Sequence, residues 1–228
     1  MITIRRSQHR GHAEHGWLDS RHTFSFAEYY DPAQMGHSHL RVINEDRVQA
    51  GRGFGAHGHR NMEIVSYVID GELEHRDTLG TRGVIRPGEV QLMSAGRGIR
   101  HSEMNGSSEV PVHFLQIWLL PREGNTEPRY AQRDFGQERG IRLVLSPDGR
   151  DDSLTIGQDV DIYRVLLDAG AVEPLALRRR RGWVQVVSGT LDVNGVRLYP
   201  GDGAQLTDVS DLKLEAQEAV NALVFDLL

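Results

Sequence analysis

Two short segments of the sequence carry side chains that could bind a metal ion. His57 and His59 lie two residues apart in GFGAHGHRNMEIVSY (53–67), and His101 and Glu103 lie two residues apart in HSEMN (101–105). Side chains at positions i and i+2 of a β-strand point to the same face. If both segments are strands that line one barrel and face inward, three imidazoles and one carboxylate converge on one interior point.

Such a ligand set suits a borderline divalent ion, namely Fe, Mn, Co, Ni, Cu or Zn. It leaves one or two coordination positions open, as in a catalytic site that admits small molecules. The chain has no cysteine, so a metal ion has to be held by nitrogen and oxygen. Glu63 lies four residues after His59 and would share its strand face, so spacing alone leaves either Glu63 or Glu103 as the carboxylate ligand.

The histidines are distributed unevenly along the chain. All eleven lie between His9 and His113, so any chemistry of histidine belongs to the first half. The other histidines have ordinary structural explanations. We expect a solvated loop for His37 and His39, and positions at the surface, at caps or at strand ends for His9, His12, His15, His22, His75 and His113.

Composition excludes several classes of partner. The 228 residues carry a formal net charge of −6, which repels nucleic acid and anionic membranes. The N-terminal stretch MITIRRSQHRGHAEHG lacks the apolar segment of a signal peptide, and no run of about 18 apolar residues could span a bilayer. We therefore expect a cytoplasmic protein that binds neither nucleic acid nor membrane.

Short β-like runs separated by glycine or proline predict an all-β fold, a sandwich or a barrel. The best helix candidate is DPAQM (31–35), and a turn is expected around PRYAQRDF (128–135). The run Arg178 to Arg181 is expected to be a solvated edge.

The chain also looks duplicated. YVIDGELEHRD and VIRPGEVQL in the first half match QVVSGTLDVNG and VRLYPGDGAQL in the second. Matching Gly71 to Gly189 puts Leu175 and Leu177 in place of His57 and His59, and the stretch opposite HSE reads LEAQ. The second barrel should therefore lack the metal site.

Six motifs together resemble the pirins, a branch of the bicupins within the cupin superfamily. They are GWLDSRHTFSFAEYYDP (16–32), LRVINEDRV (40–48), GFGAHGHRNMEIVSY (53–67), MSAGRGIRHSEMN (93–105), LQIWLLP (115–121) and LVLSPDGRDDSL (143–154). The resemblance is closest to bacterial members described as quercetin 2,3-dioxygenases. It implies two tandem cupin (jelly-roll) barrels with a few short helices: residues 1–130 with the metal, and residues 131–228 without ligands.

The resemblance also implies roles for individual residues. It assigns His57, His59, His101 and Glu103 as metal ligands, and it selects Glu103 over Glu63 as the carboxylate. One divalent ion, with Fe(II) as the first candidate, would bind the 3-hydroxyl oxygen of a flavonol such as quercetin. Reaction with O2 would then release carbon monoxide and a depside, with Glu103 also acting as general base.

Some questions stay open after the resemblance. Phe54, Met62, Met93 and Ile99 are candidates for the pocket wall, although large apolar residues near strand ends more often belong to the core. Arg97 could orient another group or lie at the surface. A second hypothesis is a metal-containing regulatory protein or redox sensor with a protein partner and little turnover. We expect a monomer.

Overall fold

The computed structural model describes residues 1–228, and nearly all of its regular structure is β-strand. It has 22 strands and two 3-10 helices, η1 (Ser7–His9) and η2 (Arg150–Asp152), with no α-helix. Neither helix has the length or apolar character needed to cross a membrane. The all-β prediction is confirmed.

The two local predictions, a helix at residues 31–35 and a turn at residues 128–135, were wrong. Residues 31–35 form a turn in place of a helix: the Gln34 N–H donates to the Asp31 carbonyl and the Ala33 N–H donates to the Asp31 carboxylate, each at 2.9 Å. An aspartate that accepts an N–H two residues ahead favours such a turn over a helix. The expected turn at 128–135 contains strand β12 (Arg129–Asp134), which pairs with β9 (Glu89–Ser94).

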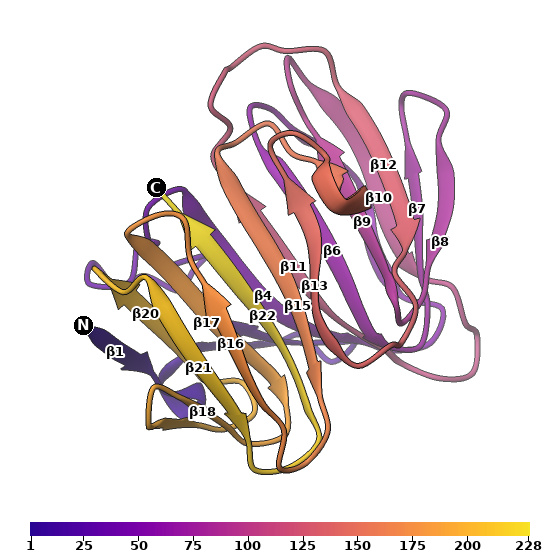
Figure 1. Ribbon diagram of the computed structural model, residues 1–228. Helices are drawn as coiled ribbons and strands as arrows, with labels where there is room; N and C mark the ends of the chain where they lie inside the picture. The colour runs from indigo at the N-terminus through magenta and orange to yellow at the C-terminus, as the bar shows by residue number, and fades with distance from the viewer. The chain divides into compact units, whose positions relative to one another are not determined.

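Residues Gly11–Gly136 form one compact unit built from two antiparallel sheets (Figure 1). The larger sheet has the order β12-β9-β6-β11-β4-β3-β2, and the smaller has the order β5-β10-β7-β8. The remaining strands are β2 (Gly11–Glu14), β3 (Leu18–His22), β4 (Leu40–Val48), β5 (Gly53–His59), β6 (Glu63–Asp70), β7 (Leu73–Asp77), β8 (Arg82–Ile85), β10 (Ile99–Asn105) and β11 (Val112–Leu119).

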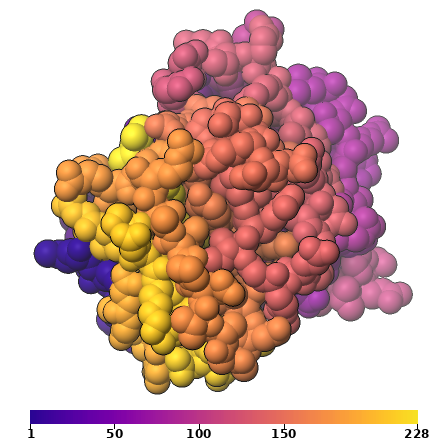
Figure 2. All heavy atoms as spheres, viewed as in Figure 1, coloured from indigo at the N-terminus to yellow at the C-terminus, as the bar shows by residue number.

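Residues Met1–Arg10 and Gln137–Leu228 form the second compact unit. Its sheets have the orders β1-β20-β17-β22-β15-β13-β14 and β16-β21-β18-β19. Its strands are β1 (Ile2–Arg5), β13 (Gly140–Ser146), β14 (Leu154–Thr155), β15 (Val160–Leu167), β16 (Val172–Ala176), β17 (Arg181–Ser188), β18 (Leu191–Val193), β19 (Val196–Leu198), β20 (Gly203–Thr207), β21 (Asp211–Ala216) and β22 (Val220–Leu227). In Figure 2 the indigo first residues lie against the orange and yellow residues of this same unit.

Strand order confirms the duplication. The order β5-β10-β7-β8 recurs as β16-β21-β18-β19, and β9-β6-β11-β4 recurs as β20-β17-β22-β15. His57 pairs with His101 across β5 and β10, and the matching residue Leu175 pairs with Leu212 across β16 and β21. The residue that replaces His101 is therefore Leu212, two positions before the LEAQ stretch suggested by the sequence.

The interiors of the two units differ in polarity. In the first unit a row of directly paired polar residues crosses the larger sheet, and it consists of Gln132, Gln91, Ser66, Gln116, Asn44 and His22. The matching row of the second unit is mostly apolar and consists of Ile4, Ala204, Val184, Val224, Tyr163 and Leu143. Buried polar groups cost free energy unless they have partners. The first unit therefore carries a polar interior that its duplicate does without.

The run Arg178 to Arg181 is only partly solvated. Arg179 is 9% exposed, and its guanidinium contacts the carboxylates of Asp226 (3.3 Å), Asp161 (2.9 Å) and Asp159, the first two of which are fully buried. Arg180 is 85% exposed and pairs with Asp208 at the surface. The expectation of a solvated edge therefore fails for Arg179, because buried carboxylates need a cation.

We predict that Arg179→Ala lowers the free energy of unfolding by about 3 kcal/mol, because it removes the ion pair of buried Asp226, whereas Asp161 keeps its pair with Arg150 at 2.6 Å. Arg180→Ala should change it by about 0.5 kcal/mol or less, since an exposed pair contributes little. Chemical denaturation of both variants measures the difference. Equal stability of the two would show that Arg179 has no structural role.

Candidate metal centre

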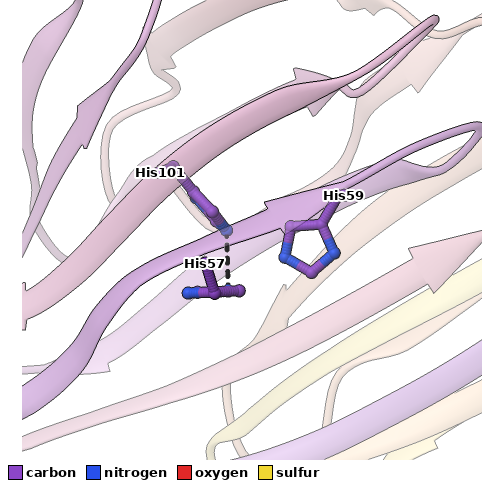
Figure 3. A group of neighbouring side chains, drawn as sticks. All are labelled: His57, His59 and His101. Carbon is purple, nitrogen blue, oxygen red and sulfur yellow. Dashed lines mark hydrogen bonds between the residues drawn. The ribbon is translucent and has the colours of Figure 1, made fainter.

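Three imidazoles converge in the first unit. His57 and His59 extend from β5 and His101 extends from the neighbouring strand β10, and one ring nitrogen of each lies within 4.8 Å of the other two (Figure 3). The Nε2 atoms of His57 and His101 are 3.0 Å apart. Two nitrogens that each lie about 2.1 Å from a metal ion are about 3.0 Å apart when they bind at right angles. The three histidines can therefore bind a divalent metal ion.

A β-bulge places His57 opposite His101. The pairing of β5 with β10 shifts between His101 and Glu103, so that Phe54 faces Glu103 and one extra residue of β5 lies between the pairs. Bulges of this kind redirect side chains next to active sites. Gly53 permits the close approach of the two strands, because a Cβ there would lie 2.3 Å from the Glu103 carbonyl oxygen.

A hydrogen bond to the backbone determines which nitrogen of the His57 ring carries a proton. Its Nδ1 lies 2.8 Å from the Gly55 carbonyl oxygen, which can only accept, so Nδ1 carries the proton. In a neutral imidazole the other nitrogen then has a lone pair. The Nε2 lone pair of His57 faces the space shared with His101.

Burial keeps the rings of His59 and His101 neutral. Burial, followed by the neighbouring histidines His101 and His57, lowers the pKa of His59 to about 4. Burial, followed by His57 and His75, lowers the pKa of His101 to about 3. Both rings are therefore uncharged near pH 7, which is the form that binds a metal ion.

Glu103 lies on the same strand as His101 but is held on the side of the larger sheet. Its Oε1 accepts hydrogen bonds from Gln116 Nε2 (2.8 Å) and Ser66 Oγ (3.2 Å), and its Oε2 accepts from Gln116 Nε2 (2.7 Å). Its charge also acts on His59. The other candidate, Glu63, is buried and accepts a hydrogen bond from Ser94 Oγ at 2.8 Å.

The sequence candidates for the pocket wall pack in apolar clusters beside the site. Met62, Met93 and Ile99 pack in one apolar cluster, and Phe54 packs edge-on against Trp17, with ring centroids 5.3 Å apart. Met93 and Ile99 are buried, whereas Met62 and Phe54 are partly buried. Ile99 pairs with His59 across the strands, and Phe54 pairs with Glu103. Arg97 is exposed and pairs with exposed Glu127 at 2.6 Å, and His37, expected in a solvated loop, is buried.

Sequence reasoning missed other residues near the centre. His75 is buried beside His101, and the Trp118 ring lies edge-on to His59, with centroids 4.9 Å apart. Phe26 in turn lies edge-on to Trp118 at 5.4 Å. The only available signal was the spacing of His75 and Asp77 in EHRD, which repeats the x+2 pattern of the ligand pairs.

A second buried polar group lies on β3 and β4. The Ser20 hydroxyl donates to the Asp46 carboxylate, and His22 Nε2 lies 2.9 Å from Ser20 Oγ. Burial raises the pKa of Asp46 to about 7, with the Ser20 hydrogen bond opposing and the charges of Glu103, Glu45 and Asp19 adding to the rise. Asp46 therefore changes charge near neutral pH.

This carboxyl makes the stability of the metal-free protein depend on pH. Between the unfolded value of 3.8 and about 7, folded Asp46 binds more protons than the unfolded chain, so its contribution to stability falls as the pH rises. Asp46→Asn should remove this slope, so its stability relative to wild type should increase by roughly 3 kcal/mol between pH 5 and pH 8. Urea denaturation at both pH values measures this, with exposed Asp70→Asn as the control. A constant difference at the two pH values would contradict the assignment.

Comparison with known proteins follows the same division of the chain. The Pirin family profile matches residues 3–119, and the profile of the quercetinase C-terminal cupin domain matches residues 143–227. A quercetin 2,3-dioxygenase of Escherichia coli (strain K12) is 50% identical over 229 residues, covering 100% of this chain and 99% of that relative. A pirin-like protein of Caulobacter vibrioides is 39% identical and covers 95% of each chain.

Solved structures agree. The bacterial pirin YhhW from Escherichia coli, in complex with nickel(II), has a TM-score of 0.96 and 49% identity, covering 100% of this chain and 99% of that one. Both barrels are therefore cupin domains. The similarity in sequence and fold over the full length shows that the chain belongs to the pirin family.

Proposed function

We propose that this protein is a metal-dependent dioxygenase that opens the ring of flavonols such as quercetin with O2 and releases carbon monoxide. The observation that carries the proposal is the group of three imidazoles, of which His59 and His101 are neutral, with the buried carboxylate of Glu103 on the same strand as His101. The full-length relative at 50% identity, a quercetin 2,3-dioxygenase, supports the substrate class.

For the ligand set we propose His57, His59, His101 and Glu103, with Fe(II) as the ion. The nickel(II) complex of the bacterial relative supports a divalent ion. A divalent ion supplies Lewis-acid chemistry here, because it lowers the pKa of the flavonol 3-hydroxyl. The net positive charge that remains after one carboxylate favours the deprotonated substrate.

Glu103 is the base that accepts the hydroxyl proton. Gln116 Nε2 lies 2.8 and 2.7 Å from its two oxygens, which holds the carboxylate in place. The Ser66 hydroxyl lies 3.2 Å from Glu103 Oε1 and 3.1 Å from Gln116 Oε1. When Glu103 takes up a proton, Ser66 can turn its own proton to Gln116 and continue to act as a partner.

The surroundings suit a flat aromatic substrate. The rings of Trp118 and Phe26 continue from His59 in a series of edge-to-face contacts. Aromatic side chains provide large apolar surfaces with a preferred geometry for another ring. Beside polar Glu103 and Gln116, they combine an apolar wall with a few polar groups, as small-molecule sites require.

Anaerobic titration with quercetin tests the binding step. We expect the long-wavelength absorption band of quercetin to shift to the red with metal-loaded protein, because the 3-hydroxyl loses its proton, and to remain in place with metal-free protein. Unshifted quercetin with both forms would contradict the proposal. The metal-free protein also serves as the control for binding outside the centre.

A further inference from the structure

A buried chain of three side chains, His101, His75 and Asp77, begins at the metal centre on the side of the His101 ring that is opposite His57. The Nδ1 of His101 lies 3.5 Å from the Nδ1 of His75, and the Nε2 of His75 lies 2.9 Å from the Asp77 carboxylate. The side chains of His75 and Asp77 are 0% exposed. Cross-strand pairing holds the chain in place, because Asp77 is directly opposite His101 and His75 is directly opposite Glu103.

The chemistry of the groups gives this chain a direction. An ionised carboxylate only accepts hydrogen bonds, so the Nε2 of His75 carries the proton that Asp77 receives. The Nδ1 of neutral His75 is then an acceptor, and it receives the N–H of His101 Nδ1. This leaves a lone pair on His101 Nε2, which faces His57.

We propose that His75, oriented by Asp77, is a positioning residue that sets the proton of His101 on Nδ1 and keeps its Nε2 lone pair available to the metal ion. This inference rests on the proposed metal centre. The lone pairs of His57 and His101 then meet across 3.0 Å, an arrangement that repels unless a cation lies between them. Without the acceptor on His75, the proton of His101 can move to Nε2. The Nε2–H group would then donate a hydrogen bond to His57, and this hydrogen bond would compete with the metal ion.

Neighbouring groups hold Asp77 and His75 in place. Asp77 Oδ1 accepts the backbone N–H groups of Leu79 (2.8 Å) and Thr81 (3.1 Å). Burial alone would raise the pKa of Asp77, but the hydrogen bonds from His75, Thr81 and Leu79 lower it below its ordinary value, so the group is ionised. The Tyr130 ring packs on His75, with centroids 4.8 Å apart.

The second unit lacks the chain, as it lacks the histidine group. His75 pairs with Glu103 across β7 and β10, and the matching pair across β18 and β21 is Val193 with Leu214. Both residues of that pair are buried apolar side chains. The barrel fold therefore does not itself require a histidine at this place.

Metal affinity tests the proposal against a purely structural role. We expect His75→Phe, which keeps a ring and removes both nitrogens, to weaken nickel(II) and zinc(II) binding by about 10- to 100-fold. His75→Gln should lose less, because its amide can donate to Asp77 and accept from His101. The matched control is His113→Phe, since His113 forms a similar pair with Glu45 (2.9 Å) and is not part of the histidine group.

Affinity of His75→Phe equal to that of the His113→Phe control would overturn the proposal, and so would an equal loss in His75→Gln and His75→Phe. If the wild-type protein bound neither nickel(II) nor zinc(II), the proposed metal centre itself would be wrong. If the wild-type protein bound the ions and the His75 variants had the same affinity, only the proposed role of His75 would be wrong.

A measurement on wild-type zinc(II) protein does not depend on the folding of any variant. Nuclear magnetic resonance should find a proton on Nδ1 of His101 that exchanges slowly with solvent, because it is buried and bound to His75. In His75→Gln the proton should remain, and in His75→Phe it should exchange faster. A fast-exchanging or absent Nδ1 proton in the wild type contradicts the proposal.

Discussion

Replacing His101 with alanine is expected to abolish retention of a divalent ion. His101 supplies the nitrogen that lies 3.0 Å from His57, and its loss leaves His57 and His59 without the imidazole that β10 contributes. Replacing a residue that hydrogen-bonds to a metal ligand typically lowers the metal affinity by about 10- to 100-fold. Loss of the ligand itself should therefore lower it by about 100-fold or more. Elemental analysis after dialysis against a weak chelator measures the effect.

His15→Ala is the matched control, because His15 is an exposed histidine of the same unit. It should keep the full metal content. Unchanged metal content in His101→Ala would show that the three histidines do not form the site. Loss in both variants would point to general instability, which unfolding midpoints would reveal.

Glu103→Gln is expected to remove most turnover while leaving the three imidazoles in place. The amide cannot take the flavonol proton, and general-base catalysis contributes about 10²- to 10⁴-fold. We therefore expect a fall in kcat of that size, with a smaller loss of metal than in His101→Ala. Turnover per bound metal ion, measured as oxygen uptake with quercetin, separates the two effects.

Glu63→Gln is the control for this prediction, because Glu63 is also buried and was the alternative carboxylate ligand. Glu63 accepts its hydrogen bond from Ser94, whereas Glu103 accepts from Gln116 and Ser66. Replacing Glu63 should therefore change turnover per metal ion only a few-fold. A large loss in Glu63→Gln with little effect of Glu103→Gln would reverse the two roles.

The histidine group was predictable because it depends on strand periodicity. The x+2 spacing places His57 and His59 on one face whatever the rest of the fold does, and the structure brings them together with His101. The same holds for the duplication, whose glycine and Pro-Gly turns recur at matching places. Only the match to HSE was wrong, by two residues: the residue in the place of His101 is Leu212, not the first residue of LEAQ. The pairing of β21 depends on contacts that the sequence does not show.

Residues that act through tertiary contacts could not be found in this way. His22 and His75 read as ordinary histidines in sequence, because their partners, Ser20 with Asp46 and Asp77 with His101, depend on cross-strand pairing. The polar row across the larger sheet takes one residue from each of six strands, so no local pattern reveals it. Likewise, no local signal indicated that β1 adds to β20, about 200 residues later.

Oxygen consumption with quercetin tests the central claim most directly. Metal-stripped protein is rebuilt anaerobically with Fe(II), Mn(II), Co(II), Ni(II) or Cu(II), and carbon monoxide is measured with oxygen uptake. We predict metal-dependent uptake with one carbon monoxide released per O2 consumed, fastest with Fe(II). Tight metal binding without uptake or carbon monoxide, for every ion, would contradict the dioxygenase and favour a metal-containing regulatory protein.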